Sequence, residues 1–151
     1  MTTKLKLAFG CNLVAITIVT LLALIYLFTP QLLPYQQAAI GTDWSDLSSG
    51  QQTQFLSLMK VSGGGYLATA ASLSVLLWIP FRRREAWARW AIPAIGIPAL
   101  LIVNYAGLTI IRNTPGRPPL IAGLVGVILL IAGFALSAGS SRERLPDIPS
   151  H

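Results

Sequence analysis

The sequence predicts an all-α integral membrane protein, a bundle of four transmembrane helices with one long extracytoplasmic loop. Of its 151 residues, 54% are hydrophobic and 11% are charged, whereas about a quarter are charged in a typical soluble domain. The mean hydropathy is +0.65, and four uncharged stretches each approach the ~20 residues that cross a bilayer. We expect one membrane domain over residues 1–139 and a disordered cytoplasmic tail over residues 140–151.

The first predicted span follows two lysines, Lys4 and Lys6, and resembles a secretory signal in that respect. Its apolar stretch is longer than the 7–15 residues of a signal, and no small-residue cleavage site follows it. We therefore interpret it as a membrane helix. The four predicted spans cover residues 7–28, 61–80, 91–111 and 120–138.

The connection between Pro30 and Lys60 is the one long loop, and it carries apolar residues throughout. We expect it to lie on the outer surface of the membrane. Within it, Ser48 is followed three residues later by Gln51, which is the spacing of a capping box. This spacing predicts a helix that begins before the membrane and continues into the second span.

The distribution of lysine and arginine predicts the orientation, because basic loops are retained on the cytoplasmic side of a membrane. With the N-terminus inside, eight basic residues fall on that side and three on the other. The inner set is Lys4, Lys6, Arg82, Arg83, Arg84, Arg89, Arg142 and Arg144, and the outer set is Lys60, Arg112 and Arg117. We therefore expect a protein of the bacterial inner membrane with both termini cytoplasmic. The net charge of +6 is dispersed between apolar segments, so we expect no nucleic acid partner.

The residue types that carry most catalysis and metal binding are missing from the predicted spans. Cys11 is the single cysteine and His151 the single histidine, which excludes a cysteine–histidine metal cluster and an intrachain disulfide. The five acidic residues, Asp43, Asp46, Glu85, Glu143 and Asp147, all lie outside the spans, so no intramembrane carboxylate can carry protons. We predict no catalytic residue, no metal and no cofactor, and this composition argues against an enzyme.

A candidate polar site lies in the outer half of the membrane, where three consecutive glycines, Gly63, Gly64 and Gly65, precede Tyr66 in the second span. With a rise of ~1.5 Å per residue, Tyr66 lies ~7 Å and Asn104 ~5 Å to the outer side of the middle of their spans. They could therefore share a level. We expect the glycines to admit the third span or a small ligand there, with Tyr66 and Asn104 as hydrogen-bond partners.

Small residues recur at a spacing of four along the second and fourth spans, which aligns them on one helix face. The two sets are Gly64, Ala68 and Ser72, and Ala122 and Gly126. Such faces pack closely either within the bundle or against another subunit, and both interpretations stay open.

Lys60 begins the second span at the outer boundary, where its stem can lie along lipid while its ammonium reaches water. An ion pair with Asp43 or Asp46 in the long loop is the alternative.

The function predicted from these features is a small multi-pass membrane protein that acts as a non-catalytic accessory or interaction subunit. Its expected partners are membrane lipids and a homo-oligomer or larger membrane complex. The alternative is a small oligomeric channel or transporter with a polar site near Tyr66 and Asn104.

The predicted orientation places the long loop outside the cell. A cysteine introduced by Ser49→Cys should therefore react with a membrane-impermeant maleimide in intact cells. The wild-type chain, whose Cys11 lies in the first predicted span, gives the background. Labelling that occurs only after lysis would reverse the orientation.

Overall fold

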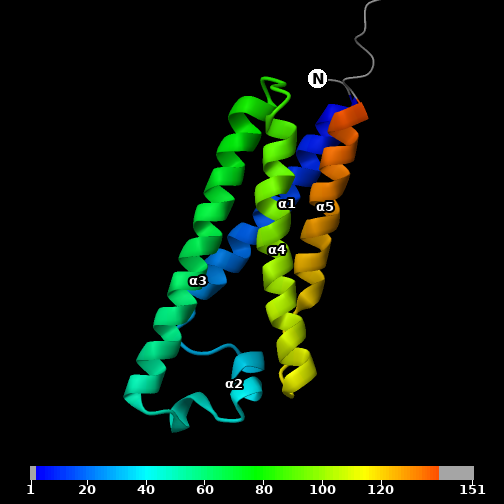
Figure 1. The fold of residues 1–151 in the computed structure, drawn as a ribbon. Helices are drawn as coiled ribbons and strands as arrows, with labels where there is room; N and C mark the ends of the chain where they lie inside the picture. Colours follow the sequence, from blue (N-terminus) through cyan, green and yellow to red (C-terminus); the bar gives the residue numbers. More distant parts are fainter. Residues whose placement is uncertain (1–2, 140–151) are drawn as a thin grey trace, which may run out of the picture.

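The computed structural model describes residues 3–139. This part of the chain consists of helices joined by irregular connections and contains no strand (Figure 1). The long helices are α1 (Thr3–Phe28), α3 (Ser49–Leu76), α4 (Ala88–Asn113) and α5 (Leu120–Gly139). Each of the four helical segments is long and apolar enough to cross a membrane. The predicted four-helix membrane bundle is confirmed, while the predicted tail, residues 140–151, lies outside the described residues.

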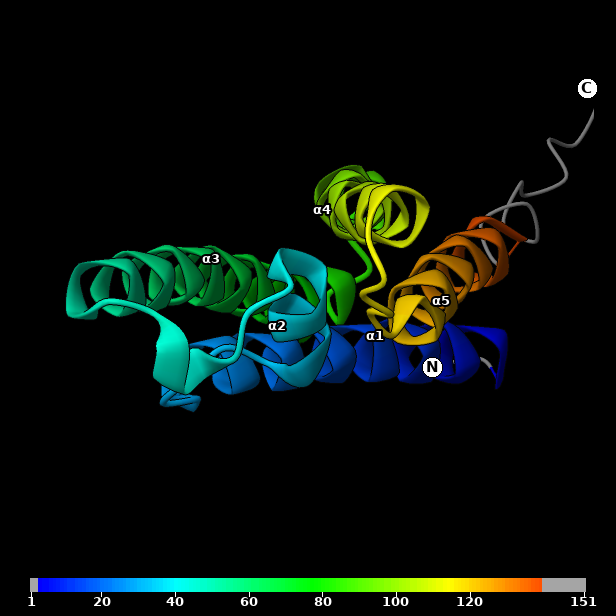
Figure 2. The same ribbon diagram turned by 90° about the horizontal axis from the view of Figure 1, so that it is seen from below.

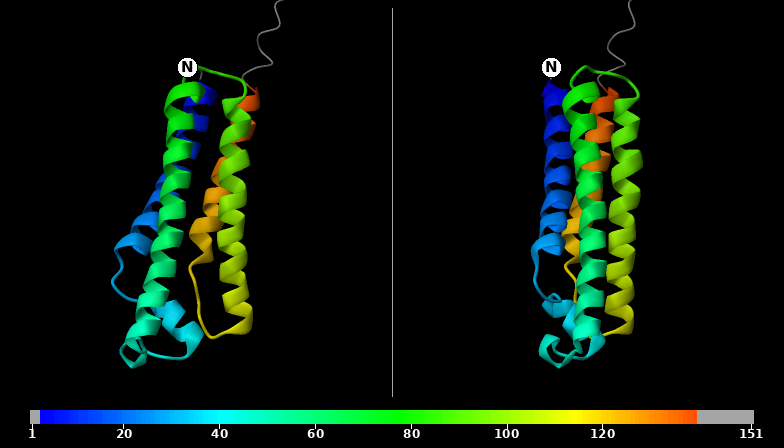
Figure 3. Two further views of the ribbon diagram at one scale, coloured as in Figure 1. Left: turned by 60° about the vertical axis from the view of Figure 1, so that its left-hand side comes forward. Right: turned by 90° about the vertical axis from the view of Figure 1, so that its left-hand side faces the viewer.

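The first helix, α1, organises the bundle because it contacts both α3 and α5, crossing behind them at an angle (Figure 1). Helix α4 packs mainly on α5 and contacts α3 much less. Seen along the bundle, α3 and α5 both lie beside α1, and α4 lies on one side of that layer (Figure 2). The start of α1, the end of α5 and the connection between α3 and α4 lie at the same end of the bundle (Figure 3).

The beginning of α3 is fixed by the predicted capping box. The Gln51 N–H donates to Ser48 Oγ at 3.4 Å, and the Ser48 N–H donates to Gln51 Oε1 at 3.0 Å. The helical segment then continues for 33 residues to Phe81, about 50 Å at 1.5 Å per residue. A hydrocarbon core is about 30 Å thick, so the first turns of α3 extend beyond it.

A π-helical turn, Leu77–Phe81, directly follows α3 and contains Pro80. Proline has no N–H to donate and its ring crowds the preceding turn. A wider turn lets the chain pass this residue while Leu77 and Phe81 stay buried in the core. The connection to α4 follows at once and places Arg84 in the left-handed region, with φ of 62°.

The long loop contains two short helical elements that we did not predict, α2 (Pro34–Ile40) and the 3₁₀-helix η1 (Trp44–Asp46). Signals for α2 are present in the sequence. Pro34 occupies its first turn, the Leu33 N–H donates to Gln36 Oε1 at 2.9 Å, and Gly41 ends the helix with φ of 68°. Proline at the start and a left-handed glycine at the end are typical helix boundaries.

Three tyrosines attach α2 to the bundle. The hydroxyls of Tyr26 on α1 and Tyr35 on α2 are 2.5 Å apart and share a hydrogen bond. The ring of Tyr66 on α3 meets the ring of Tyr26 edge to face, with centroids 5.7 Å apart. Burial raises the pKa of the Tyr35 hydroxyl above its ordinary value, although its hydrogen bond with Tyr26 acts in the opposite direction. This tyrosine cluster therefore holds α2 beneath the end of α1.

Removing the hydroxyl of Tyr35 should loosen α2. We expect Tyr35→Phe to lower the free energy of unfolding by about 1 kcal/mol, the typical net value of one hydrogen bond. It should also increase proteolysis between α2 and η1 in mild detergent. The matched control is Tyr105→Phe, since Tyr105 on α4 is 73% exposed. Equal effects of the two variants would contradict the role of the tyrosine cluster.

Candidate intramembrane site and helix contacts

Tyr66 and Asn104 lie at two different helix interfaces. Tyr66 is half-buried and faces Tyr26 on α1. Asn104 donates from Nδ2 to the carbonyl of Leu100 at 2.8 Å, and its amide lies against Gly123 of α5. Among residues 3–139, no hydrogen bond joins Tyr66 to Asn104. The structure does not bring together the two polar groups of the expected site.

Of the three consecutive glycines of α3, Gly63 meets another helix, and this helix is not the one expected. A Cβ atom on Gly63 would lie 3.1 Å from the carbonyl oxygen of Ala23 and 2.9 Å from Leu27 Cγ. The helix admitted at Gly63 is therefore α1 and not α4, which corrects the expectation. The physical reason is that α1 crosses α3 at this level, while α4 packs on α5. At Gly64 and Gly65 an added Cβ would meet nothing within 4 Å.

Two asparagine side chains instead point at glycines of α5. Asn12 on α1 is 2% exposed, and a Cβ on Gly133 would lie 2.7 Å from its Oδ1. A Cβ on Gly123 would lie 2.9 Å from Asn104 Oδ1. Within the described chain, neither Oδ1 atom accepts a conventional hydrogen bond. At Gly133 the nearest atom in the Cβ direction is Asn12 Oδ1, so the glycine Cα–H faces that oxygen, a contact worth about 0.5–1 kcal/mol at helix interfaces. At Gly123 the nearest atom is instead Asn104 Nδ2.

The interface of α4 and α5 is a series of large side chains set over glycines. A Cβ on Gly96 of α4 would lie 2.6 Å from Leu130 Cδ1, and one on Gly126 of α5 would lie 2.7 Å from Leu100 Cδ1. Gly126 thus lies inside the bundle, whereas Ala122, four residues earlier, is exposed. Close backbone approach at glycines, with a bulky neighbour above each, is a common way in which membrane helices pack.

The predicted small-residue face of α3 lies on the outside of the bundle. Gly64, Ala68 and Ser72 are all exposed. The Ser72 hydroxyl donates to the carbonyl of Ala68 at 2.9 Å, so the face has no hydroxyl in need of another partner. The small-residue face of α3 therefore does not pack within the bundle, and packing against another subunit is the interpretation that is left for it.

The loop ion pair considered for Lys60 is not formed. Lys60 is exposed on α3, and in the part of the chain that the structure describes no ion pair joins it to Asp43 or Asp46. The two aspartates line an open depression of about 510 Å³ beside α2. A lysine at this boundary extends its ammonium toward water or lipid headgroups.

Chemically, serine and threonine hydroxyls on the described membrane helices bond to their own backbone, as the Thr69 hydroxyl does to the carbonyl of Gly65 at 2.9 Å. Among residues 3–139, no three histidine, cysteine, aspartate or glutamate side chains lie close enough together to hold a metal ion. Comparison with family models, with curated proteins and with solved structures gives no match for this chain. We therefore infer its function from the contacts above.

Sequence reasoning missed that Asn12 of α1 and Asn104 of α4 both pack against α5. The available signal was the abundance of glycine in the fourth span, which holds Gly123, Gly126 and Gly133. At about 100° per residue these three glycines lie within about 80° of one another, so they mark one side of the helix that neighbouring helices can approach closely. The direction in which each asparagine points around its helix axis cannot be obtained from the number of glycines.

A methyl group at Gly133 should separate α1 from α5. We expect Gly133→Ala to lower the free energy of unfolding by about 1–3 kcal/mol, the usual range for overpacking, because the new Cβ meets the Asn12 amide. Gly65→Ala is the matched control, since its Cβ meets nothing within 4 Å, and it should be neutral or slightly stabilising. Comparable losses in denaturant titrations of both variants would contradict this packing.

Proposed function

We propose that this small membrane protein is a non-catalytic interaction subunit and that α3 is the helix that meets its partner. The observation that carries the proposal is the outward position of Gly64, Ala68 and Ser72. Small residues on a membrane helix allow another backbone to approach closely, and van der Waals packing is the main force of association in lipid. The partner is then a transmembrane helix, from a second copy or from another subunit.

The exposed faces of the other helices differ from that of α3. They carry large aliphatic side chains, such as Ile102 on α4, 68% exposed, and Ile121 and Ile128 on α5, 77% and 63% exposed. On α3, Leu67 is the one large exposed hydrophobic side chain between Val61 and Val75. A face of small side chains gives no advantage to a helix that contacts lipid, whereas it allows another helix to pack closely.

The alternative function, a small oligomeric channel or transporter, requires Tyr66 and Asn104 to line one path. Tyr66 packs on Tyr26 and Asn104 lies against Gly123. Both polar side chains are therefore engaged in contacts between helices of the same chain. This arrangement favours the interaction subunit over the channel.

We also propose the bacterial inner membrane as the location, with both termini cytoplasmic. The start of α1, the end of α5 and the α3–α4 connection lie at one end of the bundle (Figure 3). That end carries most of the basic residues, and basic ends remain on the cytoplasmic side. The labelling of Ser49→Cys tests this orientation.

The proposed contact is tested by adding bulk to the face of α3. Native mass spectrometry of the full-length protein from mild detergent should show a homo-oligomer or a co-purified membrane protein. Gly64→Leu should reduce that assembly at least tenfold while the chain stays folded, because the site is open in the single chain.

The matched control for bulk is Ala106→Leu on the exposed face of α4, which should leave the assembly unchanged. A wild-type protein that is monomeric and alone, or an assembly that tolerates Gly64→Leu, would overturn the proposal. A loss with both leucine variants would place the contact elsewhere.

A further inference from the structure

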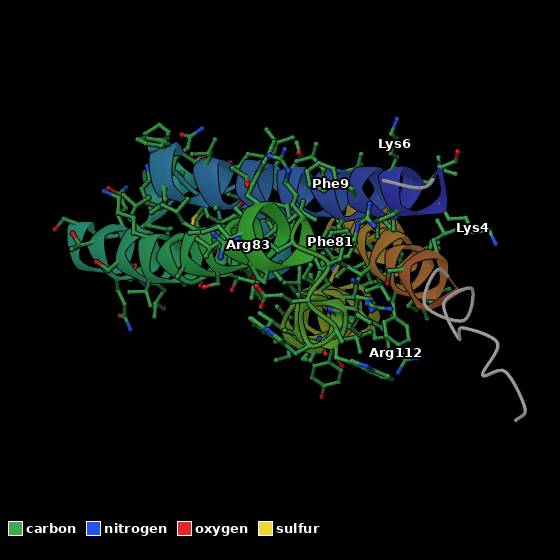
Figure 4. The ribbon with its side chains drawn as sticks, turned by 90° about the horizontal axis from the view of Figure 1, so that it is seen from above. Lys4, Lys6, Phe9, Phe81, Arg83 and Arg112 are labelled. Atoms are coloured by element: carbon green, nitrogen blue, oxygen red, sulfur yellow. The ribbon has the colours of Figure 1, made fainter. Side chains whose placement is uncertain are left out.

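One end of the bundle concentrates positive charge. Figure 4 views the molecule from this end and shows Lys4 and Lys6 on α1 and Arg83 just after α3. We call it the basic end, and among the described residues it comprises Lys4, Lys6, Arg82, Arg83, Arg84 and Arg89, with Glu85 as its acidic residue. The opposite end is nearly balanced, with Lys60, Arg112 and Arg117 against Asp43 and Asp46.

The three consecutive arginines are held in a tight turn. The Arg83 N–H donates to the carbonyl of Ile79 at 3.1 Å, and the Arg84 N–H donates to that of Phe81 at 3.0 Å. Arg84 adopts a left-handed conformation, with φ of 62°, which is uncommon for a residue with a side chain. The turn is therefore closed by its own backbone, and all three arginine side chains are exposed.

The charge of these arginines is not neutralised by protein carboxylates within residues 3–139. Glu85 accepts a hydrogen bond at 2.6 Å from the indole Nε1 of Trp87 and forms no ion pair there. Arg82 instead lies over the ring of Trp78, 5.3 Å from its centroid. The three guanidinium groups are available to an external anion.

Three exposed indoles lie at the same end. Trp78, Trp87 and Trp90 are 50%, 54% and 67% exposed. Two of them are supported from the inside, Trp78 by Phe9 at 5.3 Å and Trp90 by Phe134 at 4.5 Å between ring centroids. Tryptophan concentrates where the hydrocarbon of a membrane meets the headgroups. The indoles therefore place the arginines at the level of the lipid phosphates.

We propose that the basic end binds the phosphate groups of anionic phospholipids in preference to zwitterionic ones. Guanidinium groups form paired hydrogen bonds with phosphate oxygens, and each basic residue near an anionic surface strengthens binding about fivefold. The three exposed indoles favour a lipid over a soluble phosphate compound, because a soluble ligand gains nothing from binding at the level of the headgroups. This inference does not rest on the proposed interaction of α3.

Quenching of tryptophan fluorescence by brominated lipids tests the proposal. The full-length protein carries Trp44→Phe, so that its remaining three indoles all lie at the basic end, and is placed in nanodiscs of phosphatidylcholine. Brominated phosphatidylglycerol or brominated phosphatidylcholine is then titrated in at low ionic strength. The phosphatidylglycerol should quench at a severalfold lower mole fraction, and 1 M salt should reduce that difference.

Variants locate the effect. R83Q/R84Q should remove most of the severalfold preference for phosphatidylglycerol, because each basic residue near an anionic surface strengthens binding about fivefold. R83K/R84K, which keeps both charges, should retain most of that preference. The matched control K60Q/R112Q removes the same charge from exposed positions at the opposite end and should change nothing. Arg82 is left in place because it contacts the reporter Trp78.

Three results would overturn the proposal. Equal quenching by the two brominated lipids would show no selectivity, and equal effects of R83Q/R84Q and K60Q/R112Q would remove the basic end as its source. Competition by millimolar inorganic phosphate, at constant ionic strength set with chloride, would assign the arginines to a soluble phosphate compound.

Discussion

The bundle depends on the close approach of α5 to its two neighbours. Gly133 receives the amide of Asn12 from α1, while Gly123 and Gly126 receive Asn104 and Leu100 from α4. Lipid offers little hydrophobic drive for helices to associate, so dispersion contacts at short backbone distances must supply it. The positions of α1 and α4 are set by these glycines, and α3 joins the bundle chiefly through α1.

The four spans could be predicted from hydropathy because a bilayer imposes both the length and the composition of each crossing helix. The start of α3 was equally accessible, since the Ser48 and Gln51 capping box depends only on local chemistry. Local signals for α2, Pro34 and Gly41, are also present in the loop. They were overlooked because a seven-residue helix carries too few apolar positions to show a period.

The direction in which each helix faces could not be predicted. In a soluble protein the polar face of a helix marks its outside, but lipid and the interior of a bundle are equally apolar. Depth along the membrane normal was therefore estimated for Tyr66 and Asn104, whereas their rotation about the helix axes was not. The same uncertainty applied to Gly64 and Ala68, which the structure places on the outside of α3.

The π-helical turn at Leu77–Phe81 also determines how the chain can change in length. A π turn is equivalent to an α-helix that has gained one residue. Loss of one residue from the π-helical turn would restore regular α geometry. A deletion within α3 itself would instead rotate all the following helical residues by about 100° about the helix axis. The arginine-rich turn directly follows the π-helical turn, so the loss of one residue at Leu77–Phe81 would leave the preceding part of α3 and its membrane contacts unchanged.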